Sequence, residues 1–240
     1  MSGLRLTVTD RGEDFDATGA AVIADAIAGA PGAAIVVATG RTPMGAYARL
    51  ARDLPARSAS GLRVFQLDEY VGVAPDDARS LAGWTRRSFV DPLGVDPDTV
   101  VWLDGLAEDL AAACRAYDDA VAAAGGLDLA VLGLGPNGHL GFNEPPSDPS
   151  SGTREVPLSD ASIASNAAYR PELPVPRSAL TAGLDVLLAA RRVVLLVSGT
   201  GKAAIVHRAL EGAVTPEVPA SFLRQHPDVV VVVDRDAWET

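Results

Sequence analysis

Seven short, continuous runs of Val, Ile and Leu recur along this chain of 240 residues, each bounded by turn-forming or polar residues. Such runs are typical of buried β-strands, and the stretches between them are rich in helix-forming residues. Because strands and helices alternate and the strands are apolar on both faces, the pattern predicts parallel strands joined by right-handed crossovers. The fold class that follows is α/β, an open, doubly wound, mostly parallel sheet of the Rossmann-like type with helices on both faces.

The predicted strands are Leu4–Val8, Ala34–Ala38, Arg63–Leu67, Val100–Leu103, Leu127–Leu132, Val193–Val197 and Val229–Val233. The predicted helices are Ala17–Ala28, Pro43–Arg52, Ser80–Val90, Leu106–Ala124, Ser178–Ala189 and Lys202–Leu210. Ligands of such sheets bind beyond the carboxyl ends of the strands. The glycine-rich and acidic loops of this chain all follow predicted strands, so we expect its functional site at that edge.

The length and a hydrophobic content of 48% allow one large core, and we expect a single α/β domain over residues 1–240. No apolar run reaches the roughly 18 residues of a membrane span, and the first residues do not resemble a signal peptide, so we expect a cytoplasmic protein. The segment 145–177 is rich in proline and serine without a clear apolar period. It is expected to be irregular, as a lid over an active site or as a structural surface loop.

The net charge is −11, from 20 Lys and Arg against 31 Asp and Glu. Nonspecific binding to nucleic acid or to an anionic membrane is therefore not expected. An acidic protein that binds an anionic metabolite must build a local positive site from helix N-termini, loop amides and a few basic residues. The single cysteine, Cys114, lies in an alanine-rich helical stretch and is not expected to be a nucleophile.

Two glycine turns join predicted strands to predicted helices and suit a phosphate group. In the first, Thr39–Pro43, glycine lets the backbone approach a ligand while free amides and the helix dipole face it. The second, Ser198–Lys202, adds a cation, but it lacks the spacing of a nucleotide-binding P-loop. The predicted phosphate-binding residues are Thr39, Gly40, Arg41, Thr42 and Lys202.

A third loop contains the pattern G-x-G-x-x-G at Gly133, Gly135 and Gly138, yet it does not predict dinucleotide binding. That fingerprint requires a helix directly after the glycines, whereas this chain continues with residues 139–146, which are poor helix formers. The loop instead carries His139, with Glu144 five residues later. An imidazole beside a carboxylate is a plausible acid/base pair, although a structural histidine is the alternative. A metal site is not predicted, because the segment holds one histidine and no cysteine.

Asp68 and Glu69 follow the third predicted strand. Adjacent side chains at a strand end point in different directions, so one carboxylate is able to face a ligand while the other caps a helix or faces water. Taken alone, a carboxylate at such a turn is more often solvated than catalytic.

The stretches Leu67–Gly72 and Gly133–Pro145 closely resemble the two signature loops of glucosamine-6-phosphate deaminases. The similarity extends over most of the chain, including Thr39–Met44, Ala179–Gly183, Gly199–Lys202 and Ser221–Pro227. It implies conversion of D-glucosamine 6-phosphate and water to D-fructose 6-phosphate and ammonia, by ring opening, aldose–ketose isomerisation and deamination, with no metal or redox cofactor. The partner it implies is a small sugar phosphate. Members of the family range from monomers to hexamers, so a homo-oligomer is compatible with it.

The resemblance also implies roles for individual residues. His139 would exchange a proton with the ring oxygen, Glu144 would hold and polarise His139, and Asp68 would move a proton between C2 and C1. Lys202 and the loop around Gly40 would hold the 6-phosphate.

Three departures from the family pattern stand out. Asn137 replaces an aspartate that some members carry beside the histidine, so it is able only to hydrogen-bond. A substrate-binding arginine is replaced by Ala168, and either Arg170 or Arg41 is available to supply the missing charge. A histidine expected downstream of Asp68 is absent.

Other functions remain open from the sequence. A 6-phosphogluconolactonase has a related fold, but its histidine loop usually lacks the Phe-Asn-Glu-Pro ending found here. A deaminase or isomerase for another hexosamine phosphate fits the altered arginines. A sugar-phosphate sensor would normally carry an added DNA-binding helix-turn-helix, for which this chain has little room.

Overall fold

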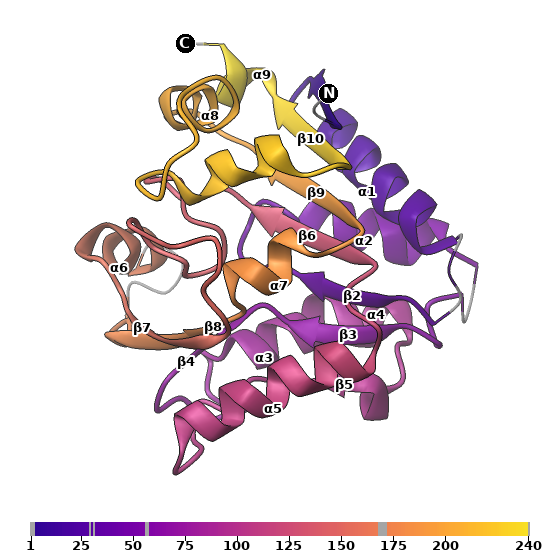
Figure 1. Cartoon of the computed structure of the whole chain (residues 1–240). Helices are drawn as coiled ribbons and strands as arrows, with labels where there is room; N and C mark the ends of the chain where they lie inside the picture. Colours follow the sequence, from indigo (N-terminus) through magenta and orange to yellow (C-terminus); the bar gives the residue numbers. More distant parts are fainter. Residues whose placement is uncertain (1–2, 29, 31, 56–57, 168–171, 240) are drawn as a thin grey trace.

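A seven-stranded parallel sheet forms the centre of the molecule (Figure 1). The computed structural model describes residues 3–28, 30, 32–55, 58–167 and 172–239. The strands, in spatial order, are β1 (Leu4–Thr9), β10 (Val229–Asp234), β9 (Arg192–Val197), β6 (Leu129–Gly133), β2 (Ala34–Val37), β3 (Arg63–Gln66) and β5 (Val100–Val101). All of their pairings are parallel. Each predicted apolar run contributes one strand, and the predicted fold class is confirmed.

Helices cover both faces of this sheet. One face packs against α1 (Glu13–Ala28), α2 (Met44–Asp53), the π-helical turn Arg86–Val90 and α4 (Asp91–Leu93). The other packs against α5 (Leu110–Ala123), α7 (Leu184–Leu188), α8 (Ala203–Leu210), the 3-10 helix Pro219–Gln225 and α9 (Arg235–Trp238). The remaining elements are α3 (Leu81–Thr85), α6 (Asp160–Ala167) and the 3-10 turn Pro97–Thr99. Among the described residues, no helix has the length and apolar character needed to cross a membrane.

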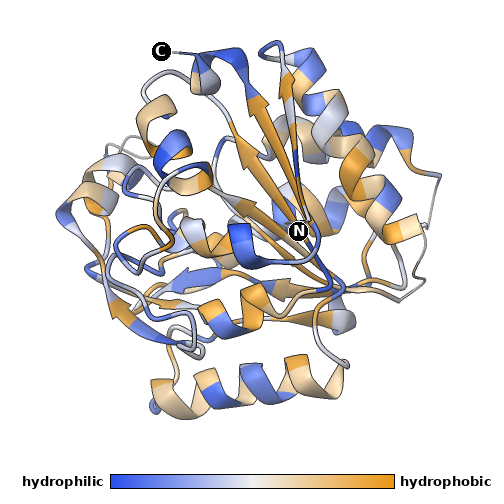
Figure 2. Ribbon diagram, turned by 45° about the horizontal axis from the view of Figure 1, so that its top comes forward, coloured by the Kyte–Doolittle hydropathy of each residue, from blue (hydrophilic) through white to orange (hydrophobic). Residues whose placement is uncertain are grey.

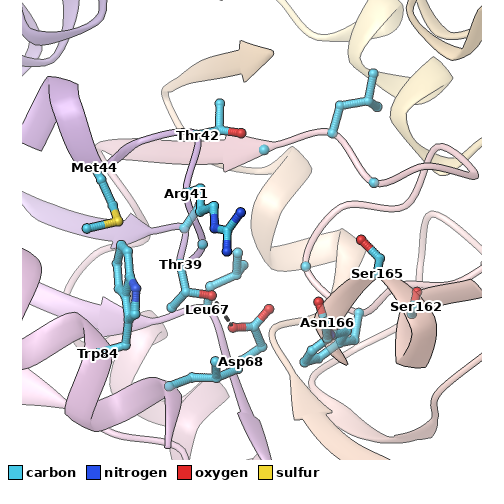
Figure 3. A pocket seen from close by; sticks show the side chains of 18 of the residues that line it. Thr39, Arg41, Thr42, Met44, Leu67, Asp68, Trp84, Ser162, Ser165 and Asn166 are labelled. Carbon is cyan, nitrogen blue, oxygen red and sulfur yellow. Dashed lines mark hydrogen bonds between the residues drawn. The ribbon is translucent and has the colours of Figure 1, made fainter. Parts of the chain in front are cut away.

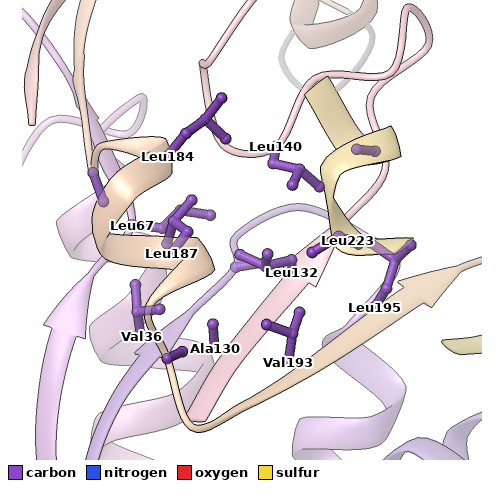
Figure 4. Packing of buried hydrophobic residues seen from close by; sticks show 14 of the residues in the cluster. Val36, Leu67, Ala130, Leu132, Leu140, Leu184, Leu187, Val193, Leu195 and Leu223 are labelled. Carbon is purple, nitrogen blue, oxygen red and sulfur yellow. The ribbon is translucent and has the colours of Figure 1, made fainter. Parts of the chain in front are cut away.

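The apolar strands divide their side chains between two cores. In β2, Val36 faces the α5 and α7 side, while Ile35 and Val37 face α1 and α2, and all three are fully buried. Figure 2 shows the strands of the central sheet as predominantly hydrophobic, and Figure 4 shows Leu184 and Leu187 of α7 over the strand residues. Burial of a Val, Leu or Ile side chain contributes about 1.5–3 kcal/mol. The continuous apolar runs are thus explained by a sheet whose inner strands are covered on both faces, with residues 5–7 of the edge strand β1 exposed.

A second, antiparallel sheet was not predicted. It has the order β4 (Asp68–Tyr70), β8 (Ser178–Thr181), β7 (Arg154–Pro157). The predicted turn at residues 68–70 is therefore a strand, and the predicted helix Ser178–Ala189 is a strand followed by the short helix α7. Segment 145–177 is also less irregular than predicted, because it contains β7 and α6. These strands have three or four residues, too few to show a clear period.

The strand order places the functional loops at one point. Strand β2 is flanked by β3, which follows it in the chain, and by β6, which lies beyond β5 in sequence. The order therefore reverses between β2 and β6, and crevices at such reversals bind ligands in open α/β sheets. The loops after β2, β6 and β9 leave neighbouring parallel strands, so they lie side by side at the carboxyl edge.

Candidate active site

A cavity of about 840 Å³ lies at this edge. It is lined by the three loops, by Asp68 of β4, by the region that begins α3, and by α6. Figure 3 shows Thr39, Arg41 and Asp68 on one side of it and Ser162, Ser165 and Asn166 of α6 on the other. The second sheet therefore forms part of the wall, because β4 continues directly from β3 of the main sheet.

Asp68 is a buried carboxyl group at the cavity wall, with 5% of its surface exposed. Its polar contact is with Thr39, whose Oγ1 donates to Oδ1 over 3.5 Å. Burial, followed by the nearby Glu69 carboxylate, raises the pKa of Asp68 to about 7. A group with this pKa exchanges protons readily at neutral pH, which is the property a general base requires.

Glu69, the next residue, points away from the cavity as strand geometry requires. Its carboxylate accepts hydrogen bonds from the backbone amides of Tyr70, Leu81 and Ala82. The Ser80 hydroxyl and the Gln66 amide donate to it as well. Glu69 therefore fixes the start of α3 against β4, and the prediction that the two acidic side chains face different ways is confirmed.

His139 and Glu144 form a close pair in the loop after β6. The distance from His139 Nδ1 to Glu144 Oε2 is 3.3 Å, and both side chains are nearly buried. The Asn137 amide donates to the same oxygen over 2.6 Å, and the Ser162 hydroxyl donates to Oε1. Burial alone would raise the pKa of Glu144, but hydrogen bonds from His139, Ser162 and Asn137 and the charge of His139 lower it to about 2.

The glycines of this loop make room for the imidazole. A Cβ atom at Gly135 would lie 2.1 Å from ring atoms of His139, so no other residue fits there without displacing the ring. Gly138 has a φ of +91°, in the left-handed region that favours glycine. Residues 134–153 contain no helix, so the G-x-G-x-x-G pattern here serves the histidine and not a dinucleotide.

The two predicted phosphate loops meet at the same cavity. Thr39, Gly40, Arg41 and Thr42 line it from the β2 side, and Lys202 lines it from the start of α8. The Lys202 ammonium group donates to the Leu134 carbonyl over 2.8 Å, and burial lowers its pKa. A cation fixed beside glycine turns and a helix start is suited to an anionic group.

The predicted residues do not all occupy the cavity wall. Asp68 and His139 line it, whereas Asn137 and Glu144 lie behind His139 and contact it or each other. Arg41 is one of the two residues proposed to replace the substrate-binding arginine of the family pattern. It lines the cavity, and Figure 3 shows its side chain extending into it. Ala168 and Arg170 lie outside the described residues.

Arg79 lies near the sequence position, downstream of Asp68, at which the family pattern would place a histidine. It forms an ion pair with Asp77 and donates to the Pro174 carbonyl over 3.4 Å. Arg79 and Pro174 both line the cavity.

Two further residues were missed by the sequence analysis. Ser162 contacts both Glu144 and His139 from α6. Arg154 of β7 donates to Asn143 Oδ1 over 2.9 Å, while the Asn143 amide donates to the carbonyls of Leu140 and Ala182. These contacts brace the loop that carries Glu144. A charged residue in a short strand and a serine in a helix give no local signal, because their partners lie far away in sequence. Within the described part of the chain, no group of three His, Cys, Asp or Glu side chains is arranged to hold a metal ion.

Comparison with known proteins agrees with this geometry. Residues 12–232 match the family described as glucosamine-6-phosphate isomerases/6-phosphogluconolactonase. A glucosamine-6-phosphate deaminase of Cutibacterium acnes is 45% identical, over 82% of this chain and 77% of that protein. One of Clostridium perfringens is 37% identical over 98% of both chains.

Solved structures show the same relationship. A monomeric glucosamine-6-phosphate deaminase superposes with a TM-score of 0.91 at 36% identity, covering 99% of this chain and 98% of that one. A 6-phosphogluconolactonase of Trypanosoma brucei has a TM-score of 0.80 at 20% identity over 99% and 98% of the two chains, which shows a shared fold. The match over residues 12–232 establishes that this chain belongs to the glucosamine-6-phosphate isomerase/6-phosphogluconolactonase family.

Proposed function

We propose that this protein is a glucosamine-6-phosphate deaminase, which converts D-glucosamine 6-phosphate and water to D-fructose 6-phosphate and ammonia. One observation carries the proposal. A buried carboxyl group with a pKa of about 7, on Asp68, shares a cavity with the imidazole of His139 and with two loops suited to a phosphate. The deaminases among its relatives and the deaminase structure at 36% identity support the same activity.

Asp68 is the proton shuttle in this proposal. Once the sugar ring is open, the hydrogen on C2 lies next to the C1 aldehyde and becomes acidic enough to be removed. Asp68 takes that proton and returns it to C1, which passes through an enolamine and yields the imine of fructose 6-phosphate. Water then adds to the imine and ammonia leaves. A weak base is effective for this step because the cavity holds it beside the reacting carbons.

His139 opens the ring in this proposal, with Glu144 and Asn137 behind it. The imidazole takes the proton of the C1 hydroxyl and delivers it to the ring oxygen as the bond between C1 and that oxygen breaks, so the C1 aldehyde forms and His139 returns to its neutral state. Glu144 is kept ionised by its three donors, so it stabilises the imidazolium form. Asn137 carries no charge, and its contribution is to orient Glu144 through the 2.6 Å hydrogen bond.

The 6-phosphate is held by Lys202 and by Thr39, Gly40, Arg41 and Thr42. Binding energy from this remote group positions C1 and C2 against Asp68, so the anchor serves the chemistry as well as affinity. Arg41 takes the place of the arginine that the family pattern would put at Ala168. Segment 145–177 acts as a lid within a single domain, since its helix α6 lines the cavity and contacts the acid/base pair.

The test is a coupled assay on the purified protein with D-glucosamine 6-phosphate, in which ammonia and fructose 6-phosphate are measured together. Equal amounts of both products are expected. Galactosamine 6-phosphate and mannosamine 6-phosphate serve as competing substrates, and hydrolysis of 6-phosphogluconolactone is measured in parallel. Lactone hydrolysis without ammonia release, or tight binding of sugar phosphates without turnover, would overturn the proposal.

A further inference from the structure

Ser162 lies on α6 yet touches both members of the acid/base pair. Its hydroxyl donates to Glu144 Oε1, and its Oγ lies 3.3 Å from His139 Nδ1. The residue is 1% exposed, and it lines the cavity (Figure 3). Apart from His139 and Asn137, which lie in the same loop as Glu144, Ser162 is the only described residue that donates a side-chain hydrogen bond to this carboxylate. It therefore links a separate helix to the pair.

This arrangement is not that of a nucleophilic serine. In a Ser-His-acid triad the serine and the acid contact opposite nitrogens of the imidazole, and the serine proton passes to the histidine. Here Ser162 and Glu144 both face Nδ1, and the hydroxyl proton is directed to Glu144. Ser162 thus does not direct its proton to the imidazole, as the serine of such a triad does.

The contacts determine which nitrogen of His139 carries the proton in its neutral form. Nδ1 faces Glu144 Oε2, which is only an acceptor, and Ser162 Oγ, whose own proton is engaged. Both partners accept, so Nδ1 must donate and Nε2 is left unprotonated. The other side of the ring faces Gly135, which also lines the cavity.

We propose that Ser162 is a positioning residue: it holds the Glu144 carboxylate and the Nδ1–H tautomer of His139, and so couples the placement of α6 to the acid/base pair. The predicted effect of Ser162 on kcat rests on the proposed function, whereas the assignment of the Nδ1–H tautomer to His139 does not. Charged groups from other elements line the same cavity, among them Asp68 of β4, Lys202 at the start of α8, Arg41 and Arg79. Neither Asp68 nor Lys202 hydrogen-bonds to Ser162, whose side-chain partners are Glu144 and His139, so replacing the hydroxyl acts on the pair directly.

The kinetic arm of the test uses two variants at Ser162 and one control variant away from the cavity. Ser162→Ala is expected to lower kcat about tenfold, which corresponds to about 1.4 kcal/mol, with KM within about twofold of the parent. Ser162→Thr keeps the hydroxyl and is expected to restore kcat. Ser58→Ala makes the same chemical change at an exposed serine outside the cavity, whose hydroxyl donates to the Pro55 carbonyl over 2.7 Å, and kcat is expected to stay near the parent value.

The second arm observes the imidazole protons by 15N-edited NMR. The parent is expected to show a slowly exchanging Nδ1–H signal that disappears in His139→Gln. His226 provides an internal reference, because its Nε2 donates to the Ala190 carbonyl over 2.7 Å and the residue is buried. Its Nε2–H signal should persist in every variant. In Ser162→Ala the Nδ1–H signal of His139 is expected to broaden through solvent exchange, and Ser162→Thr is expected to restore it.

An unchanged Nδ1–H signal in Ser162→Ala would overturn the inference, as would an Nε2–H signal for His139 in the parent. A fall in kcat that Ser162→Thr does not restore, accompanied by an equal rise in KM, would also overturn it, since packing of α6 would then explain the loss. If the parent releases no ammonia, the proposed function fails while the NMR arm still decides the role of Ser162.

Discussion

At the level of single residues, Asp68 and Glu69 show how two adjacent carboxylates acquire different properties. Glu69 accepts five hydrogen bonds, which satisfy a buried charge. Asp68 has the weak contact with Thr39 and is otherwise desolvated, so its pKa rises. The difference comes from which side of β4 each side chain faces. A carboxyl group with a pKa near neutrality is therefore obtained by leaving one carboxylate with a single long hydrogen bond beside another that accepts five.

Asp68→Asn is expected to lower kcat by about 10²- to 10⁴-fold, the usual contribution of a general base. Binding of the sugar phosphate, measured by calorimetry, should change little because Asn keeps the size of the side chain. Asp76→Asn makes the same chemical change at an exposed residue outside the cavity and should leave kcat unaltered. Equal losses of binding and turnover in Asp68→Asn would indicate a structural role instead.

Lys202→Ala should act mainly on affinity. Loss of a charge-assisted hydrogen bond to a phosphate, worth about 1.5–3 kcal/mol, predicts an increase in KM of about 10- to 100-fold. The control ligand is glucosamine without its phosphate, for which the parent and the variant should bind equally weakly. A variant that bound the phosphorylated sugar as tightly as the parent would contradict the anchor role.

At the level of elements, β4 and α3 act as one unit because Glu69 caps the helix that follows. The amides of Leu81 and Ala82, at the start of α3, donate to this carboxylate, and the Ser80 side chain accepts from Gly83. Leu81 and Ser80 in turn line the cavity. The cap therefore sets the shape of one wall of the site.

Glu69→Ala is expected to destabilise the protein by about 3 kcal/mol or more, because it leaves several buried donors without an acceptor. For a chain of this size that corresponds to a fall in Tm of roughly 6–12 °C, measured by calorimetry. Asp109 caps α5 at an exposed position, where its carboxylate accepts from the Ala112 amide over 2.8 Å. Asp109→Ala should cost only about 1 kcal/mol. A similar loss of unfolding free energy in the two variants would show that the burial of Glu69 adds nothing to its stabilising effect as a helix cap.

At the level of the whole molecule, the raised pKa of Asp68 links activity to stability. The pKa is about 7 in the folded protein and 3.8 in the reference state. The contribution of this group to stability is fully present below pH 3.8 and is lost as the pH rises through about 7. The ionised form that the proposed role of Asp68 requires is thus the form that the fold tolerates less well.

Asp68→Asn should therefore stabilise the protein relative to the parent more at pH 8 than at pH 5. The expected difference in the free energy of unfolding between the two pH values is about 2 kcal/mol, measured by urea denaturation. The control is Asp77→Asn, because hydrogen bonds from Arg79 lower the pKa of Asp77 to about 2, outside this window. A stability gain for Asp68→Asn that is the same at both pH values would contradict the raised pKa.

The sequence by itself determined the central sheet and the loops at its edge. The inner strands of that sheet are continuous apolar runs, and the burial of both faces leaves such a run few alternatives; the edge strand β1 contains Arg5 and Thr7 and is partly exposed. The glycine loops and His139 were also recognisable, because a positive φ at Gly138 and the tight approach at Gly135 require those residue types. Their roles in catalysis stay predictions.

Only the tertiary structure decided the second sheet and the contacts around the acid/base pair. Strands β4, β7 and β8 are short, and their hydrogen-bond partners lie far apart in sequence, so local patterns carry too little information to identify them. The same holds for Ser162 and Glu144, which are 18 residues apart. Local sequence patterns record which side chains must be buried, whereas a hydrogen bond between distant segments exists only once the chain has folded.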